Sequence, residues 1–95
     1  MLTWDEPKRK LNIKKHGLDF VGCVAIWDHF NVTREDRRQD YGKKRLICFG
    51  LFELDVVVMV YTERPKGPFI TSLRKAEKHE ERYYRQVAKE NLSQG

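Results

Sequence analysis

The sequence predicts an α+β fold in which helices pack against one antiparallel sheet. Strand-forming residues dominate the middle of the chain, in the segments RLICFGLFEL, DVVVMVYTE and PFITSL. The connections between these segments are too short for a parallel crossover, so the three strands should follow one another as an antiparallel meander. Helix signals occur toward the two ends of the chain.

A chain of 95 residues supports one modest core, and we expect a single domain over residues 1–95. The formal charge of +5 favours a polyanionic or acidic partner, such as nucleic acid or an acidic protein segment. The chain has no apolar run of the length that a signal peptide or a membrane span requires. We therefore expect a soluble, cytoplasmic protein with no membrane partner.

The sequence offers no pattern for a metal or a cofactor. Cys23 and Cys48 lie in apolar surroundings, without a CxxC motif or a histidine at metal-ligand spacing. We expect both to be buried thiols in a reducing compartment. A Ser/His/Asp nucleophile set, a phosphate-binding glycine loop and a dinucleotide fingerprint are also missing from the sequence, which sets those enzyme classes aside.

The N-terminal segment predicts a short strand, LTW, followed by two helices. The first helix should begin near Asp5 and Pro7, run to His16 and end at Gly17, because a left-handed C-terminal cap is easiest without a Cβ. Asp19 should then cap a second short helix. The apolar residues of that helix recur at three- and four-residue spacing and should face a common core, namely Phe20, Cys23, Val24 and Trp27.

The remaining segments predict an exposed strand, a central strand and a helix. Residues 31–42 are polar and charged, which suits an exposed strand and turn. Residues 56–60 are apolar throughout, which predicts a central strand covered on both faces. A last helix should run from about Arg74 to Leu92, with residues 91–95 as a frayed tail.

Glu80 is an irregularity of the last helix. On a helical wheel it lies within the apolar arc of Ala76, Tyr83 and Val87, with Tyr84 at the edge of the arc. Glu80 either marks a ragged helix edge or faces a cationic group on the sheet, since a carboxylate on a core-facing arc is costly unless paired.

Three basic residues could bind phosphate. Arg64 and Arg74 end neighbouring strands, so antiparallel pairing should place them at opposite ends of the sheet. Each is either an ordinary surface charge or a phosphate ligand. His16 either complements the dipole of its helix or forms a basic end with Lys14 and Lys15 that holds a phosphate or shares in proton transfer.

A second basic cluster surrounds an aromatic residue, Tyr41. Either it is an ordinary solvated hairpin or it binds single-stranded RNA, whose backbone needs cations and whose bases can stack. The cluster consists of Arg34, Arg37, Arg38, Lys43, Lys44 and Arg45. The other two histidines, His29 and His79, have no such setting and are assigned to the surface.

Four segments together resemble the BrnT family of type II toxins: WDEPKRKLNIKKHGLDF, RLICFGL, VVVMVYTER and ITSLRKAEKHEERYY. The resemblance implies a RelE-like fold, with a curved antiparallel sheet, two N-terminal helices and a C-terminal helix. It implies a metal-independent endoribonuclease that blocks translation through attack of the ribose 2′-hydroxyl on the adjacent phosphate. It also implies a BrnA-like antitoxin with a ribbon-helix-helix part, through which alone the toxin would contact operator DNA.

The resemblance also assigns roles to particular residues. Arg64 and Arg74 would be phosphate and transition-state cations, His16 or Glu80 would handle a proton, and Tyr83 would orient or stack. The basic groups expected to bind RNA are Lys14, Lys15, Lys44 and Arg45. Leu73, where the family pattern predicts a small residue, and the loop RPKGPF depart from the pattern. The alternative is a basic RNA-binding or partner-binding module on the same fold that cleaves nothing.

Overall fold

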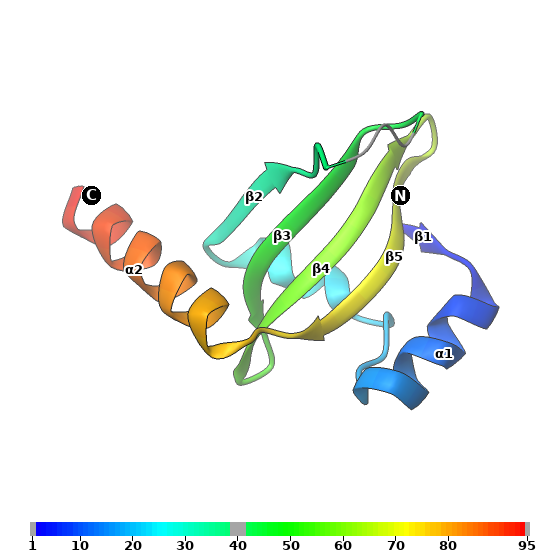
Figure 1. Cartoon of the computed structure of the whole chain (residues 1–95), viewed down its shortest axis with the longest axis horizontal. Helices are drawn as coiled ribbons and strands as arrows, with labels where there is room; N and C mark the ends of the chain where they lie inside the picture. The colour runs from blue at the N-terminus through cyan, green and yellow to red at the C-terminus, as the bar shows by residue number, and fades with distance from the viewer. Residues whose placement is uncertain (1, 39–41, 95) are drawn as a thin grey trace.

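The computed structural model describes residues 2–38 and 42–94, with the side chains of residues 93 and 94 excepted, and has an α+β architecture built on one curved five-stranded sheet (Figure 1). Along the chain the elements are β1 (Thr3–Trp4), α1 (Glu6–His16), the 3-10 helix η1 (Cys23–Asp28), β2 (Asn31–Glu35), β3 (Arg45–Phe52), β4 (Asp55–Arg64), β5 (Gly67–Lys75) and α2 (Lys78–Gln94). The strand order is β1-β5-β4-β3-β2. The sheet is mixed rather than purely antiparallel, because β1 pairs with β5 in parallel.

The predicted meander of β3, β4 and β5 is confirmed. A two-residue turn joins β3 to β4, with Glu53 in the left-handed region at a φ of 59°. Pro65 and Lys66 join β4 to β5, and Gly67 opens β5 at a φ of 118°. β4 occupies the middle of the sheet, and its residues 56–59 are buried, as expected of a central strand.

The predicted start and end of the last helix were wrong. Arg74 and Lys75 belong to β5, where Arg74 lies opposite Val58, and the Ala76 N–H still donates to the Val56 carbonyl at 2.9 Å. Pairing with β4 therefore holds the chain extended until α2 begins at Lys78. At its other end α2 continues through Gln94 instead of fraying at residue 91.

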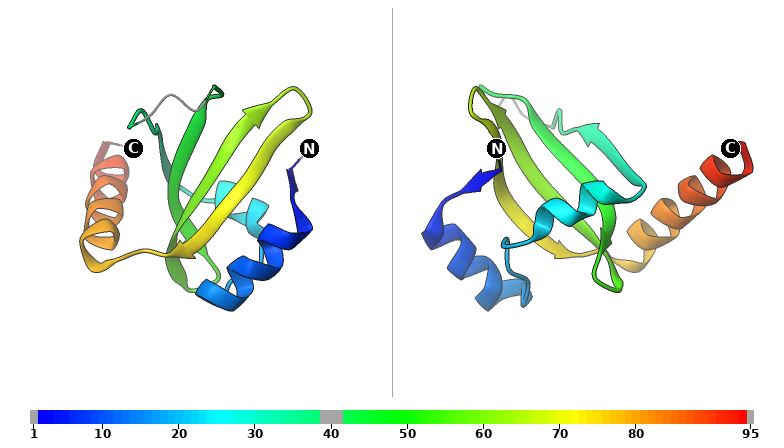
Figure 2. Two further views of the ribbon diagram at one scale, coloured as in Figure 1. Left: turned by 45° about the vertical axis from the view of Figure 1, so that its right-hand side comes forward. Right: turned by 180° about the vertical axis from the view of Figure 1, so that it is seen from behind.

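Separate helices cover the two faces of the sheet (Figure 2). On one face, Phe20, Cys23 and Ile26 pack with residues of the sheet such as Met59 and Leu73. Ile26 approaches β3 so closely that a Cβ at Gly50 would lie 2.6 Å from its Cγ2 atom. On the other face, Tyr84 of α2 packs with a smaller cluster of sheet residues that includes Phe49, Val56 and Val58.

The second N-terminal helix is shorter than predicted and is of the 3-10 type. Asp19 does not cap it; the Asp19 carboxylate accepts the Val21 N–H at 2.9 Å and binds Arg9 at 3.0 Å. Gly22, in the left-handed region at a φ of 84°, then interrupts the chain before η1. Phe20 and Cys23 are buried as expected and Trp27 packs against the core, but Val24 is 51% exposed. A 3-10 turn repeats every three residues, so Val24 does not share the face of Cys23.

The first helix begins and ends where predicted. Pro7 lies in its first turn, and Gly17 at a φ of 72° donates its N–H to the Ile13 carbonyl at 2.8 Å. Asp5 stands at the N-cap, but its side chain makes no capping hydrogen bond. The two cysteines, Cys23 and Cys48, are buried free thiols of one core, as expected, and burial raises the pKa of Cys23 to about 11.

A buried amide attaches α1 to the edge of β5. The Asn12 side chain donates from Nδ2 to the carbonyls of Leu73 at 2.7 Å and Leu18 at 2.9 Å, and its Oδ1 accepts the Leu73 N–H at 3.0 Å. β1 pairs only with Phe69 and Ile70, so the backbone of Leu73 lies beyond the end of β1. Asn12 thus replaces a neighbouring strand and satisfies backbone groups that would otherwise be buried without partners.

Substituting Asn12→Ala should lower the free energy of unfolding by about 3 kcal/mol, because it leaves buried backbone groups of β5 unsatisfied. Lys10→Ala, on an exposed position of the same helix, should change it by less than about 0.5 kcal/mol. Urea unfolding followed by circular dichroism measures both. Equal effects of the two substitutions would contradict the role given to Asn12.

Candidate functional site

Four arginines lie on the face of the sheet that α2 covers, one from each of four adjacent strands. Side chains alternate between the two faces along a strand, so residues two apart share a face. By this alternation the four arginines lie on the face of Val32, Ile47, Val58 and Phe49, which pack in the cluster beneath α2. They are Arg34 of β2, Arg45 of β3, Arg64 of β4 and Arg74 of β5.

Arg74 and Glu80 form a bidentate ion pair between the end of β5 and the start of α2. The Nη1 and Nη2 atoms of Arg74 donate to Oε1 and Oε2 of Glu80 at 2.8 and 2.9 Å. Glu80 Oε1 also accepts the Glu77 N–H at 2.8 Å, which is half of a capping box at the start of the helix. The prediction that Glu80 faces a cation on the sheet is confirmed.

Two hydrogen-bonded groups hold the Glu80 carboxylate in its charged form. The hydrogen bond from Arg74 lowers the pKa of Glu80 to about 2, assisted by the Glu77 N–H and opposed by burial. Its side chain is 14% exposed. Glu80 is therefore a fixed negative charge at neutral pH, and it orients the guanidinium of Arg74.

Arg64 lies away from this pair. It is opposite Gly67, whereas Arg74 is opposite Val58, so six residues of β4, or about 20 Å, separate the two positions along the strand. The Arg64 guanidinium lies over the ring of Phe69, 3.6 Å from its centroid. The predicted placement at opposite ends of the sheet is confirmed, and the structure does not bring Arg64 together with Arg74.

Tyr83 belongs to a cluster of aromatic rings and a guanidinium. Its ring is 41% exposed and contacts Phe49 edge to face, with centroids 5.6 Å apart. The guanidinium of Arg34 lies 5.3 Å from the Phe49 centroid and 5.7 Å from that of Tyr83. Arg34 was predicted only as a member of the second basic cluster around Tyr41, and its contact with Tyr83 was not predicted. Its place two residues after Val32 in an alternating strand could have assigned it to this face.

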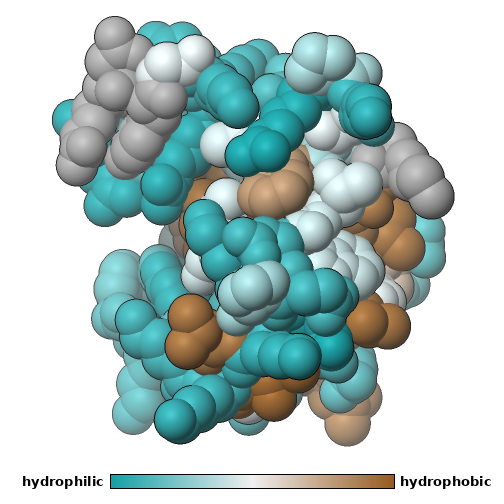
Figure 3. Space-filling model, turned by 90° about the vertical axis from the view of Figure 1, so that its right-hand side faces the viewer, coloured by the Kyte–Doolittle hydropathy of each residue, from teal (hydrophilic) through white to brown (hydrophobic). Residues whose placement is uncertain are grey.

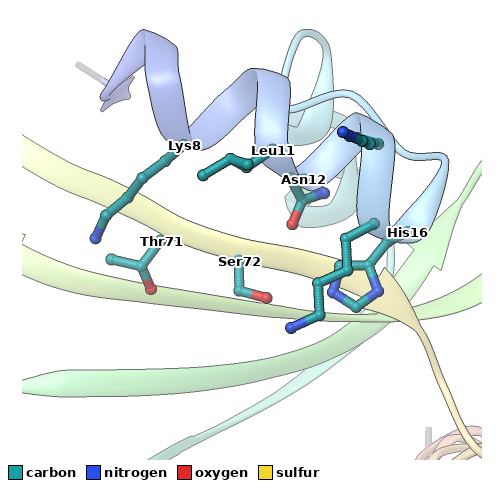
Figure 4. A pocket seen from close by; sticks show the side chains of 8 residues that line it. Lys8, Leu11, Asn12, His16, Thr71 and Ser72 are labelled. Carbon is teal, nitrogen blue, oxygen red and sulfur yellow. The ribbon is translucent and has the colours of Figure 1, made fainter.

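His16 lies at the C-terminal end of α1, in a pocket of about 640 Å³ between this helix and β5 (Figure 4). Lys14 and Lys15 line the same pocket. The pKa of His16 is lowered from its ordinary value of 6.5 by burial, and further by the charges of Lys15 and Arg74. The His16 imidazole, neutral at neutral pH, therefore lies near enough to the Arg74 guanidinium for the charge of Arg74 to lower its pKa.

The surface around this pocket is predominantly hydrophilic. Figure 3 shows the side of the molecule that bears α1 and the outer edge of the sheet, where teal side chains surround separate brown, hydrophobic patches. The exposed Leu11 of α1, which lines the pocket, is one of the hydrophobic side chains of this helix.

Apart from Arg34, the second basic cluster lies toward the other end of the sheet from Arg74. Arg45 is opposite Thr62, and its Nε lies 3.4 Å from Oδ2 of the buried Asp36, which Arg38 also binds at 2.8 and 2.9 Å. Lys44 is exposed, and its carbonyl accepts the Glu63 N–H at 3.1 Å. Tyr41 falls outside the described residues. Part of this cluster thus surrounds a buried carboxylate.

Residues 2–38 and 42–94 contain no group of three or more His, Cys, Asp or Glu side chains placed to hold a metal ion. None of the helices described is long and apolar enough to cross a membrane. His29 and His79 are exposed, as predicted.

Comparison with protein families gives one match, over residues 4–80, to the model described as the ribonuclease toxin, BrnT, of a type II toxin–antitoxin system. The chain belongs to the BrnT family. The match to BrnT covers most of the chain and includes His16, Arg64, Arg74 and Glu80, whereas Tyr83 lies beyond it. A search of curated proteins found no match. Membership identifies the chain as a ribonuclease toxin of a type II system and implies an RNA substrate and an antitoxin partner.

The ion pair of this BrnT-family protein should be measurable as stability. Glu80→Gln should lower the free energy of unfolding by about 2 kcal/mol at neutral pH, because it leaves Arg74 without its charged partner. The folded-state pKa of about 2 lies below the ordinary value of 4.5, so this contribution is complete above about pH 4.5 and is lost as the pH falls toward 2.

Urea unfolding at neutral pH and near pH 3 tests the prediction. Glu81→Gln is the matched control, because Glu81 forms only an exposed pair with Arg85 on the same helix and should contribute less than about 0.5 kcal/mol. The ion-pair assignment would be contradicted if Glu80→Gln lowered the free energy of unfolding at neutral pH no more than Glu81→Gln does. It would also be contradicted if the loss for Glu80→Gln were larger near pH 3 than at neutral pH.

Proposed function

We propose that this protein is a metal-independent endoribonuclease that cleaves RNA by attack of a ribose 2′-hydroxyl on the adjacent phosphate. The observation that supports the proposal is the placement of a neutral imidazole, His16, near a guanidinium, Arg74, whose orientation is fixed by Glu80. A proton acceptor beside a fixed cation is what this reaction requires.

His16 is the better candidate for the base. Its pKa lies below its ordinary value, so the imidazole is neutral and can accept a proton at neutral pH. Within the part of the chain that the structure describes, hydrogen bonds do not occupy both ring nitrogens of His16, so a nitrogen is left to accept the proton. A carboxylate with a pKa of about 2, as in Glu80, is a weak base, and both of its oxygens accept hydrogen bonds already. In this proposal Glu80 is a positioning residue.

Arg74 would stabilise the charge that develops on the phosphate. Its side chain is 32% exposed. Its hydrogen bonds to Glu80 and to the Lys75 carbonyl leave Nε and one N–H of Nη2 to reach a ligand. In the proposed step the O2′–P bond forms and the P–O5′ bond breaks. His16 takes the 2′-hydroxyl proton, and the leaving 5′ oxygen takes a proton from water. The products are a 2′,3′-cyclic phosphate and a 5′-hydroxyl.

The remaining basic groups on this face would hold the RNA strand. Arg64 lies about 20 Å along β4 from the position of Arg74, so it would bind a phosphate distant from the cleaved one. Tyr83, partly exposed beside Arg34, could stack on a base. Lys14 and Lys15 would act near His16, and Lys44 and Arg45 near Arg64.

Regulation would follow the family pattern. We expect a BrnA-like antitoxin with a ribbon-helix-helix part to neutralise the protein in the cytoplasm, and the pair to bind operator DNA through the antitoxin. A RelE-like arrangement of the active face is part of the same proposal.

The proposal predicts that His16→Ala and Arg74→Ala each lower RNA cleavage by about 10²-fold or more, because one removes the base and the other a transition-state cation. Lys10→Ala should cleave like the wild type. Cleavage of a mixed-sequence RNA, with and without ribosomes and in the presence of a chelator, is followed by gel, and the product ends are tested for cyclic phosphate. Wild-type protein that binds RNA but cuts none under these conditions would favour a non-catalytic binding module.

The pH dependence separates the two candidate bases. If His16 accepts the proton, kcat/KM should fall as the pH drops through a pKa below 6.5 and should be level above it, since only the neutral imidazole can act. If Glu80 were the base, activity would persist in acid until the pH approached 2. Initial rates from about pH 4 to about pH 8 at constant ionic strength distinguish these outcomes.

A further inference from the structure

The pocket between α1 and β5 extends well beyond His16. Lys8 lines its far end, eight residues or about 12 Å along the helix axis from His16. Figure 4 shows the Lys8 side chain reaching from α1 toward Thr71 of β5, with Ser72 lying between Thr71 and the imidazole. The proposed cleavage step uses none of Lys8, Thr71 and Ser72.

The lining of this pocket combines groups that suit a nucleotide. Lys8 supplies an ammonium group on one wall, and the Ser72 hydroxyl supplies a donor on the other. The Thr71 hydroxyl already donates to the Val60 carbonyl at 3.1 Å, so it can only accept. Leu11, which is 64% exposed, adds an apolar surface between Lys8 and Asn12. A volume of about 640 Å³ is within the range of small-molecule sites.

We propose that this pocket is a subsite for the nucleotide next to the cleaved bond, in which Lys8 and Ser72 bind its outer phosphate and Leu11 contacts its ribose or base. The inference rests on the proposed function, since it takes His16 and Arg74 as the cleavage centre. His16 lines one end of the pocket, so an RNA strand held at that centre could continue along α1 toward Lys8. The hydroxyls and the long basic wall match a sugar–phosphate chain better than an isolated anion.

The two elements that form the walls of this pocket are joined by a buried contact. Asn12, one turn beyond Lys8 along α1, is fixed by three hydrogen bonds. Leu73, the residue after Ser72, accepts one of them at its carbonyl and donates another from its N–H. The two walls of the pocket are therefore held together by the same contact. The spacing of the two walls would therefore be preformed, which lowers the entropic cost of binding.

Equilibrium binding to an uncleavable RNA tests the subsite independently of catalysis. The probe is a fluorescently labelled single-stranded RNA carrying 2′-O-methyl groups throughout, which cannot undergo attack by a 2′-hydroxyl. Lys8→Ala should weaken its binding by about tenfold and reduce the salt slope by about 0.7, as expected for one lost phosphate contact. Ser72→Ala should weaken it to a smaller extent.

Lys10→Ala is the matched control, because it removes the same charge from an exposed position of the same helix that does not line the pocket. It should bind the RNA nearly as the wild type does. Equal affinities for Lys8→Ala and Lys10→Ala would overturn the subsite. So would a Lys8→Ala variant that keeps its RNA affinity but is no longer inhibited by the antitoxin, which would assign the pocket to a protein segment. If Lys8→Ala weakens RNA binding but neither the wild type nor any variant cleaves RNA, the ribonuclease mechanism is overturned and the subsite is not.

Discussion

The side chain of Asn12 closes the gap that β1 leaves along the edge of β5. Its three hydrogen bonds reach Leu73 on the sheet and Leu18 in the segment after α1, so helix, loop and strand meet at one amide. α1 has few apolar contacts of its own, since Leu11 and Ile13 are exposed. The position of His16 beside β5 therefore depends on a buried polar contact more than on hydrophobic packing.

The Arg74–Glu80 pair positions the second group of the site, as the Asn12 contacts position His16. It joins the last residues of β5 to the first turn of α2, and it keeps a guanidinium oriented in a partly exposed setting. Asn12 and Glu80 thus fix the two groups proposed for catalysis from opposite sides of one strand. Rigid placement of this kind is what an active site needs when its chemistry depends on positioning and electrostatics.

The two faces of the sheet differ in what they carry. One face is buried under Phe20, Cys23 and Ile26, and carries the larger core. The other face is only partly covered by α2 and bears an arginine from each of four strands. Two of these arginines, Arg45 and Arg74, pair with carboxylates, whereas Arg34 and Arg64 lie over aromatic rings. This face therefore offers guanidinium groups to a polyanion, and the opposite face carries the larger core.

The sequence alone determined the features that local chemistry controls: the meander of β3 to β5, the Gly17 cap, the buried thiols and the need of Glu80 for a cation. It also carried the family motifs, which lie in continuous segments. The tertiary structure alone decided that β1 pairs in parallel, that Asn12 completes the edge of β5, that Arg34 joins Tyr83, and that Arg74 belongs to a strand. These features depend on backbone groups and side chains far apart in the chain. The periodicity of one segment does not show which distant segment it will contact.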